Sequence, residues 1–219
     1  MVHAAIFDMD GILFDTERLC CDAWRAVSSE EGYVMDDSLF FSCVGRNNRD
    51  TRDIVMATLG EAFPYERFNV RAREWMRARM EESGPPEKPG VRTILQYFCD
   101  KSVPVALATS TGEKSARWMI ERAGLSRFFT AYAFGSEVER GKPEPDIFLL
   151  ANSRLGGFHP SNCAVFEDSP AGLKAGSSAG MRTVFVPDMI ASGPDTAPFV
   201  WKQISSLEEA AFPSFYDDM

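Results

Sequence analysis

Cysteine is scarce in this sequence, and long apolar runs are absent from it. The five cysteines are an odd number and their spacings match no common zinc motif, so we expect free thiols in a reducing compartment. The N-terminal stretch MVHAAIF lacks the basic region and the long apolar core of a signal peptide. No segment reaches the roughly 18 apolar residues that a membrane helix needs. These absences predict a cytoplasmic protein that makes no membrane contact.

Positive charge is also in short supply. Lysine and arginine total 23 against 32 aspartates and glutamates, which gives a net charge of −9. This balance disfavours nucleic acids and anionic membranes as partners. It leaves a phosphorylated substrate open, because local cations or a metal ion can offset the average. The 219 residues are 45% hydrophobic, enough for one large domain or one domain with an insertion.

The stretch HAAIFDMDGILFDT, at residues 3–16, carries the first chemical signal. The apolar run Ala4–Phe7 is typical of a buried strand, and it ends in Asp8-Met9-Asp10-Gly11. Because alternate strand residues share a side, Asp8 and Asp10 should face the same way at the carboxyl end, where open α/β sheets bind ligands. Two adjacent carboxylates repel unless a cation separates them. The pair therefore predicts a metal ion with a nucleophile or an acid/base, with a solvated acidic turn as the alternative.

Helical patterns fill the segment that follows. The apolar spacing predicts helices at 16–31, 38–43, 49–59 and 64–82. Thr16 is the expected N-cap of the first helix, and Gly32 its expected end. No strand is expected between residues 16 and 84, and SGPPEKPG at 83–90 is the clearest linker.

Beyond the linker, strands and helices alternate. We expect strands at 103–109, 131–135, 163–167 and 182–186, and helices at 90–101, 112–123, 144–155, 170–179 and 204–211. Such alternation implies a parallel sheet with crossover helices. The predicted fold is therefore α/β: a Rossmann-like parallel-sheet catalytic core at 1–15 and 86–219, interrupted by an all-helical cap domain at 16–85.

Polar residues stand at four of the predicted strand ends. They are Asp8 and Asp10, then Thr109 with Ser110 and Thr111, then Lys142, and finally Glu167 and Asp168. Acids, hydroxyls and a lysine at one sheet edge suit phosphoryl transfer. Asp8 could attack phosphorus, Asp10 could act as acid and base, and Mg²⁺ could bridge carboxylates and phosphate oxygens.

Each signal has an ordinary structural alternative when it is taken alone. Lys142 could be a surface lysine, Thr109 could cap the next helix, and Glu167-Asp168 could be the acidic start of a helix with Pro170 in its first turn. The joint occurrence of these residues in order at successive strand ends favours the catalytic interpretation.

Taken together, these motifs resemble those of the haloacid dehalogenase-like hydrolases, in the subgroup with an inserted helical cap. The matching motifs are Asp8-Met9-Asp10-Gly11, Thr109 in LATST, Lys142 in GKPEPDIF and Glu167-Asp168 in FEDSPAG. The resemblance covers essentially the whole chain. It implies that Asp8 forms an aspartyl phosphate and that Asp10 is the general acid/base. Asp15 lies where the predicted core gives way to the cap, so we expect it to anchor the hinge.

The resemblance also implies a Mg²⁺ cofactor and assigns the other motif residues. Thr109 and Lys142 would stabilise the transferring phosphoryl group. Glu167 would bind the metal directly or through water, and Asp10 would bind it through its backbone carbonyl. The implied catalytic residues are Asp8, Asp10, Thr109 and Lys142, and the implied metal ligands are Asp8, Asp10, Glu167 and Asp168.

Departures from individual members of the superfamily favour a phosphatase. Dehalogenases lack the second acid, here Asp10, and phosphonatases use a cap lysine that residues 16–31 do not contain. The β-phosphoglucomutases share the EDSPAG motif, but their cap histidine corresponds to Cys20, and their Lys-Gly-x-x-Arg signature becomes VGRNN at 44–48. We therefore expect a Mg²⁺-dependent phosphatase acting on a small organic phosphate, a sugar phosphate in particular. A β-phosphoglucomutase-like phosphomutase and a catalytically silent phospho-ligand-binding relative are the alternatives.

Substrate contacts are expected from the cap and from one strand end. The candidates are Glu17, Arg46, Asn47, Arg49 and Ser110. For Arg46 and Arg49, capping or solvating a helix is an equally good interpretation. The expected partner is a small phosphorylated metabolite, and the expected assembly is a monomer or a weak dimer.

Overall fold

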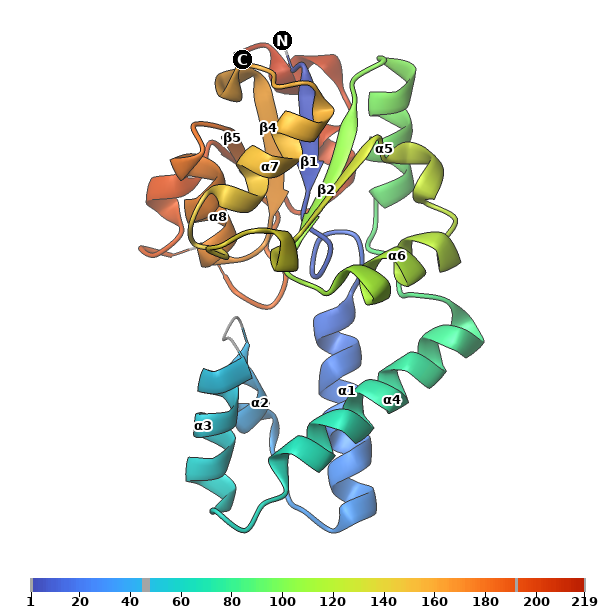
Figure 1. The fold of residues 1–219 in the computed structure, drawn as a ribbon, viewed down its shortest axis with the longest axis vertical. Coiled ribbons are helices and arrows are strands. Elements are labelled where there is room, and N and C mark those ends of the chain that lie inside the picture. The colour runs from blue at the N-terminus through green and yellow to red at the C-terminus, as the bar shows by residue number, and fades with distance from the viewer. Residues whose placement is uncertain (1, 45–47, 192, 219) are drawn as a thin grey trace. The chain divides into compact units, whose positions relative to one another are not determined.

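The computed structural model describes residues 2–44, 48–191 and 193–218, and the chain divides into two compact units. One unit combines Met1–Phe14 with Glu87–Met219, and the other is Asp15–Pro86 (Figure 1). Asp15 and Pro86, which the sequence placed in the core, fall in the second unit. The Asp15 N–H donates to the Pro86 carbonyl at 2.8 Å. The segment that leaves the first unit and the segment that returns to it are therefore hydrogen-bonded to each other at this point. No helix in the described ranges is long and apolar enough to span a membrane.

A parallel sheet forms the centre of the two-segment unit, which we call the core unit. Over the described residues its strands are β1 (Ala4–Phe7), β2 (Val105–Thr109), β3 (Ala131–Phe134), β4 (Cys163–Glu167), β5 (Arg182–Phe185) and β6 (Lys202–Gln203). Their order is β3-β2-β1-β4-β5-β6, and every neighbouring pair is parallel. The predicted α/β class with a Rossmann-like sheet and a helical insertion is confirmed. The sequence did not predict β6, because two residues carry no periodicity.

Helices cover the sheet. The core helices are α5 (Val91–Asp100), α6 (Glu113–Arg122), α7 (Asp146–Leu155) and α8 (Pro170–Ser178). Short 3₁₀ helices connect the elements: η1 (Ser126–Phe128), η2 (Gly135–Glu137), η3 (Pro160–Asn162), η4 (Ala197–Phe199), η5 (Leu207–Ala210) and η6 (Pro213–Tyr216). The predicted helix at 204–211 is wrong, because the chain there forms only the short 3₁₀ helix η5.

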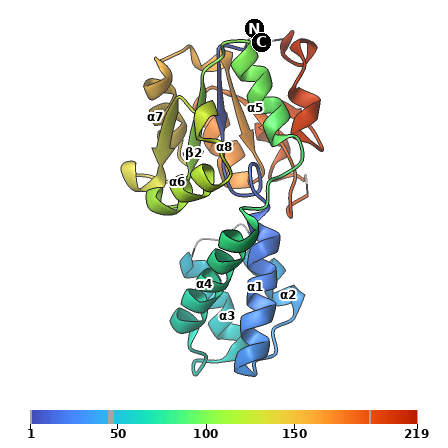
Figure 2. The same ribbon diagram turned by 90° about the vertical axis from the view of Figure 1, so that its right-hand side faces the viewer.

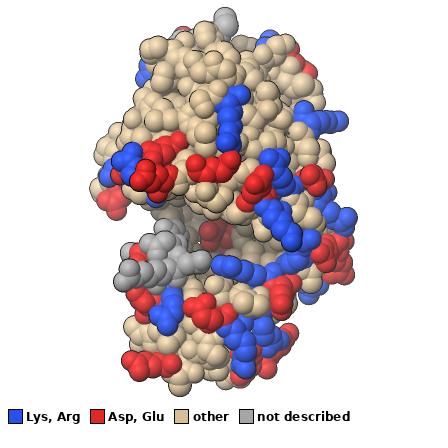
Figure 3. All heavy atoms as spheres, in the orientation of Figure 1, with Lys and Arg blue, Asp and Glu red and all other residues tan. Residues whose placement is uncertain are grey.

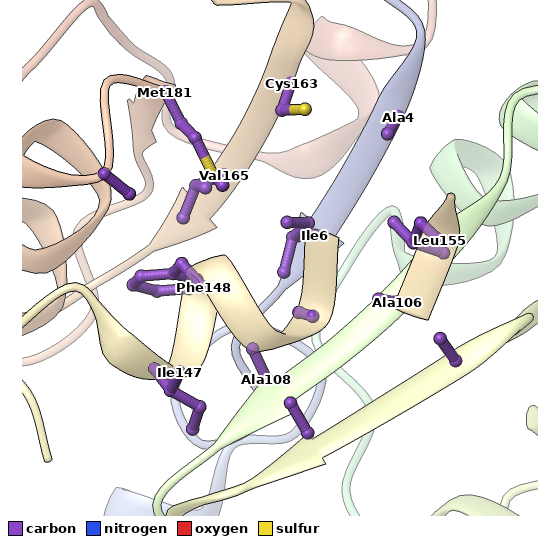
Figure 4. Packing of buried hydrophobic residues seen from close by; sticks show 14 of the residues in the cluster. Ala4, Ile6, Ala106, Ala108, Ile147, Phe148, Leu155, Cys163, Val165 and Met181 are labelled. Carbon is purple, nitrogen blue, oxygen red and sulfur yellow. The ribbon is translucent and has the colours of Figure 1, made fainter. Parts of the chain in front are cut away.

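Small residues on one face of the sheet let α7 pack against it. Strand positions on this face include Ala4, Ala106 and Ala108, all fully buried. Figure 4 shows Phe148 of α7 over the side chains of neighbouring strands. Because alanine side chains add little height to the sheet, the larger helix residues can fill the remaining space at native density.

Aromatic residues pack on the opposite face. Phe7 of β1 stacks on Phe166 of β4, with ring centroids 4.4 Å apart, and meets Phe98 of α5 edge-on at 6.0 Å. All three are fully buried, and each such ring contributes roughly 1.5–3 kcal/mol through burial. Phe7 and Phe166 immediately precede Asp8 and Glu167, so this packing fixes the two strand ends that carry those acids.

Helices make up the second unit, with no strand among its described residues. They are α1 (Thr16–Glu31), α2 (Asp37–Cys43), α3 (Asn48–Leu59) and α4 (Tyr65–Ser83), and α1 lies alongside α4 (Figure 2). Trp24 meets Phe40 and Phe68 edge-on, at 5.3 and 5.7 Å. These rings are the buried centre of the unit and give it a hydrophobic core of its own.

The surface of this helical unit pairs opposite charges. Arg71 on α4 reaches Glu30 and Glu31 on α1 at 2.5 and 2.6 Å, and Arg77 pairs with Glu81 one turn away at 2.7 Å. Lysine and arginine side chains lie among acidic ones on the face shown in Figure 3. An exposed pair such as Arg77–Glu81 contributes only about 0–1 kcal/mol, so the aromatic core stabilises the unit more than surface pairs of this kind do.

The element boundaries agree with the predicted ones to within two residues, apart from the tail, but one cap is different. Thr16 is the first helical residue of α1, and Asp15 occupies the N-cap position. The Asp15 side chain does not cap the helix; its carboxylate pairs with Arg18 at 2.9 Å instead. Gly32 ends the helix with a φ of 74°, as glycine favours.

Candidate active site

The end of β1 places the first acid next to β4. Phe7 is in register with Phe166, and the Asp8 N–H donates to the Phe166 carbonyl at 3.1 Å. Asp8 is 7% exposed, whereas Asp10, two residues later, is half-buried. Gly11 turns the chain with a φ of 77°, a value that glycine adopts readily. The two acids therefore stand in different environments on one short loop.

Lys142 connects the ends of three strands. Its Nζ donates to Asp8 Oδ1 at 2.5 Å and to Glu167 Oε1 at 2.6 Å, and it lies 3.5 Å from the Ala108 carbonyl of β2. The lysine side chain is only 8% exposed. A surface lysine does not have this burial or these partners, so the alternative that Lys142 is an ordinary surface residue is excluded.

Glu167 is held on both of its oxygens. While Oε1 accepts from Lys142, Oε2 accepts from the Asp168 N–H, the Ser169 N–H and the Ser169 hydroxyl at 2.9–3.0 Å. A Cβ on Gly172 would lie 1.7 Å from Glu167 Oε1, so this position accepts only glycine. With both oxygens accepting hydrogen bonds from protein donors, Glu167 orients Lys142. Its role as a metal ligand, direct or through water, stays a prediction.

Ser169, and not one of the two acids before it, caps the helix that follows β4. Its hydroxyl accepts from the Gly172 N–H at 3.1 Å, so Ser169 is the N-cap of α8 and Pro170 begins the helix. Glu167 and Asp168 precede this N-cap, so neither of them takes the N-cap position.

Asp168 lies against the loop that follows β1. A Cβ built on Gly11 would lie 2.1 Å from Asp168 Oδ2, so the carboxylate touches the Gly11 backbone. Burial, followed by the charges of Glu167 and Asp8, raises the pKa of Asp168 well above its usual range. The carboxylates that follow β1 and β4 are thus brought together.

A hydroxyl that the predicted site set omits holds Asp10. Thr111 Oγ1 donates to Asp10 Oδ2 at 2.6 Å. The buried Thr109 accepts from the Thr111 N–H at 3.0 Å and thereby shapes this turn, and Gly112 is the N-cap of α6, so Thr109 does not cap that helix. Ser110 between them is exposed. The motif LATST contains Thr111, but only the fold shows which hydroxyl reaches Asp10.

Four carboxylates gather at this edge of the sheet, and Lys142 contacts two of them, Asp8 and Glu167. Burial raises the pKa of Asp8 to about 7; Lys142 opposes this shift, and Glu167 and Asp10 add to it. Burial alone would lower the pKa of Lys142, but Asp8 and Glu167 outweigh it and raise that pKa. Repulsion from the neighbouring acids adds to the raised pKa of Asp8, so a further cation would be favourable at this site.

The donor atoms fit magnesium, although the side chains as they stand form no cluster. Among the described residues, no group of three or more His, Cys, Asp or Glu side chains is arranged to hold a metal ion. Asp8 and Asp168 supply two mutually repelling carboxylates, and the backbone carbonyl of Asp10 lies on the same loop. Oxygen donors of this kind are what Mg²⁺ prefers, and a divalent cation would relieve the repulsion.

The remaining predicted contacts belong to the helical unit. Glu17 is half-buried in the first turn of α1. Arg46 and Asn47 lie outside the described residues, and so does the side chain of Arg49, whose backbone belongs to α3. Substrate recognition by these four residues stays a prediction.

Comparison with known proteins identifies the family. The model of the haloacid dehalogenase-like hydrolases matches residues 2–180. The chain is 36% identical to a phosphorylated carbohydrates phosphatase of Thermotoga maritima, over 84% of each protein. It is 31% identical to a fructose-1-phosphate phosphatase of Escherichia coli, over 83% of this chain and 94% of that one.

Solved structures agree with the sequence relatives. A Thermotoga maritima protein, provisionally designated a β-phosphoglucomutase, matches with a TM-score of 0.83 and 32% identity over 100% of both chains. The family match, the phosphatases among the relatives and the shared fold all point the same way. The chain belongs to the haloacid dehalogenase-like hydrolases, and the predicted class of enzyme, a phosphoric monoester hydrolase, is confirmed.

Proposed function

We propose that this enzyme is a Mg²⁺-dependent phosphatase that releases phosphate from a small sugar phosphate through an aspartyl phosphate on Asp8. The observation that carries the proposal is the different setting of the two acids: Asp8 is buried against Lys142, and Asp10 is half-buried and bound by Thr111. Relatives named as phosphatases of phosphorylated carbohydrates and of fructose 1-phosphate support the substrate class. The core unit would be the catalytic domain and the helical unit its cap.

In the first step, a carboxylate oxygen of Asp8 attacks phosphorus, and the bond from phosphorus to the sugar oxygen breaks. Asp10 enters this step protonated and gives its proton to the departing oxygen. Lys142 holds Asp8 in place, and Thr109 and Lys142 are suited to bind the non-bridging phosphoryl oxygens. Glu167 keeps Lys142 oriented.

In the second step, Asp10 is a carboxylate and takes a proton from water. The water oxygen attacks phosphorus, the bond to Asp8 breaks, and inorganic phosphate leaves. The balance is one phosphate ester and one water converted to one alcohol and one phosphate. Magnesium bound by Asp8, Asp168 and the Asp10 carbonyl would neutralise negative charge at the phosphoryl group.

Phosphate release from a panel of substrates tests the proposal. We expect hydrolysis of 4-nitrophenyl phosphate and of hexose and pentose phosphates in Mg²⁺, and loss of activity in EDTA that added Mg²⁺ restores. Within the panel, sugar phosphates should give the highest kcat/KM. Equal activity with and without EDTA would contradict the metal requirement, and a preference for a non-sugar ester would contradict the substrate class.

Replacement of Asp10 by asparagine should separate the two chemical steps. Loss of a positioned acid/base costs about 10²–10⁴-fold, so turnover of sugar phosphates should fall by that range. With 4-nitrophenyl phosphate, whose leaving group needs no proton, a burst of nitrophenol and phosphorylated Asp8 should remain. Rapid-quench kinetics and intact-protein mass measure both. Thr111→Val removes only the hydroxyl partner and should cost about 10-fold or less, while full sugar-phosphate turnover by Asp10→Asn would refute the acid role.

A phosphomutase is the second candidate, because one structural relative is designated a β-phosphoglucomutase. The protein would be incubated with β-glucose 1-phosphate and a catalytic amount of the glucose bisphosphate. Our proposal expects phosphate release to exceed formation of glucose 6-phosphate. Rapid isomerisation without comparable phosphate release would establish the mutase instead.

A further inference from the structure

A buried ion pair lies beside the site, and the mechanism above does not use it. Lys88 Nζ lies 2.7 Å from Asp188 Oδ1, and the two side chains are 15% and 0% exposed. Asp188 lies just beyond β5, and Lys88 lies where the chain re-enters the core unit after the helical insertion. The pair therefore joins two segments that are 100 residues apart in the sequence.

The end of β5 lies next to the end of β4. The Val186 N–H donates to the Glu167 carbonyl at 2.9 Å, which continues the pairing of the two strands past their last residues. The pKa of Asp168 rises through burial, then through the Glu167 and Asp8 charges, and to a smaller extent through the Asp188 charge. Asp188 is thus within electrostatic reach of the site.

The re-entering segment holds the loop that carries Asp10. The Lys88 N–H donates to the Leu13 carbonyl at 2.9 Å, and Phe14 pairs with Glu87 as an antiparallel bridge. Within the loop, the Gly11 N–H donates to the Phe14 carbonyl at 2.8 Å, and Asp10 pairs with Phe14. A continuous set of contacts therefore leads from Asp188 through Lys88 to the backbone of Asp10.

The segment has little freedom to move on its far side. A Cβ on Gly90 would lie 2.6 Å from the Glu208 N atom, so the backbone at Gly90 already presses on η5. Lys88 is consequently fixed by the β5 end through its side chain, while η5 fixes the chain two residues further on.

We propose that Lys88 and Asp188 are positioning residues that hold the Asp10 loop in its catalytic place by tying the re-entering segment to the end of β5. The proposal rests on the function proposed above, in which Asp10 protonates the leaving group. Loss of the ion pair loosens the backbone contacts of Leu13 and Phe14 with the re-entering segment. The Asp10 carboxyl is then no longer held at a fixed distance from the leaving oxygen. Phosphorylation of Asp8 by an ester whose leaving oxygen needs the proton then slows, and phosphorylation by an ester with a good leaving group does not; the later attack of water slows equally for both.

The leaving-group ratio is the catalytic test. In single-turnover rapid-quench experiments, Lys88→Met should lower the rate constant of Asp8 phosphorylation about 10-fold with a sugar phosphate and less than about 3-fold with 4-nitrophenyl phosphate, at a temperature where both proteins are folded. The nearly isosteric Asp188→Asn should do the same, and the double variant should lose no more than either single one. Lys88→Arg should keep a ratio close to that of the unmodified enzyme. A merely structural pair would lower both rates equally, and that result would overturn the proposal.

A matched control removes another ion pair in the core unit. Lys202→Met on β6 breaks the 2.8 Å pair with Asp218 and changes the net charge equally, and it should leave the ratio unchanged. If the ratio moved as far in this variant as in Lys88→Met, the effect would be general and the proposal would be overturned.

Hydrogen exchange provides a readout that does not depend on activity. The Gly11 and Lys88 amide hydrogens should exchange at least about 10-fold faster in Lys88→Met and Asp188→Asn than in the unmodified protein, and no faster in Lys202→Met. Unchanged exchange at Gly11 would overturn the proposal. If the unmodified protein hydrolysed neither ester, the proposed function would fail, while the exchange result would still decide whether this pair holds the loop.

Discussion

Asp8→Asn is expected to lower phosphate release by about 1,000-fold or more while the protein stays folded. Asparagine has nearly the same shape as aspartate but no charged oxygen that can attack phosphorus. Lys142 keeps its 2.6 Å contact with Glu167, so the variant leaves no buried cation alone. Steady-state phosphate release and mass detection of the phosphorylated enzyme measure the effect.

The stability of this variant has an expected sign. Because burial first of all raises the pKa of Asp8 from 3.8 to about 7, the folded protein binds a proton that the unfolded chain has lost between those values. Without metal, this extra bound proton stabilises the folded protein at low pH, and the stabilisation is lost as pH rises from about 4 through about 7. The Asp8→Asn variant has no carboxyl at this position to titrate. In EDTA its Tm should therefore fall less than that of the unmodified protein between pH 5 and pH 8.

The control for Asp8 is the same change at an exposed position. Asp22 on α1 is 57% exposed and pairs with Arg25 at the surface, so Asp22→Asn should keep activity within about twofold. Normal turnover by Asp8→Asn, or an equal loss in Asp22→Asn, would show that Asp8 is not the nucleophile.

Lys142→Met is expected to be the most destabilising change in the site. It leaves the carboxylates of Asp8 and Glu167, 10% and 1% exposed, without their shared cation. Removing one partner from a buried ion pair costs about 3–5 kcal/mol. Activity should fall by about 10²–10³-fold, because the cation that binds the phosphoryl oxygens is missing. Chemical denaturation and phosphate release measure the two effects separately.

A double variant separates stability from chemistry. Adding Glu167→Gln to Lys142→Met removes one of the unpaired charges, so part of the lost stability should return. Activity should not return, since no cation has been restored. A double variant as unstable as the single one would contradict the charge argument, and full activity in Lys142→Met would contradict the catalytic role of the lysine.

The sequence was sufficient to predict which strand ends carry polar residues. Asp8, Thr109, Lys142 and Asp168 follow or end apolar runs, and parallel strands bring such ends to one edge of the sheet. The structure places all four in the core unit, with Lys142 bonded to Asp8. The alternation of strands and helices was sufficient to predict the fold class, because it implies a parallel sheet with crossover helices.

Side-chain partners could not be predicted, because they depend on rotamers and on residues far away in the chain. The role of Glu167 as a metal ligand stays a prediction, and only the structure shows that its oxygens accept hydrogen bonds from Lys142 and from the Ser169 N–H. Thr111 rather than its exposed neighbour Ser110 reaches Asp10. Arg46 and Asn47 lie outside the described residues, so their predicted role rests on the sequence alone.

By itself, the sequence determined the family, the α/β core with its helical insertion, and the acids that follow the first strand. Local periodicity and short motifs carry that information, since each depends on residues close together in the chain. The tertiary structure alone decided that Lys142 lies between Asp8 and Glu167, and that Lys88 is tied to Asp188. Those contacts join residues 25–134 positions apart, and burial in a shared low-dielectric site, which no local pattern encodes, gives them their strength.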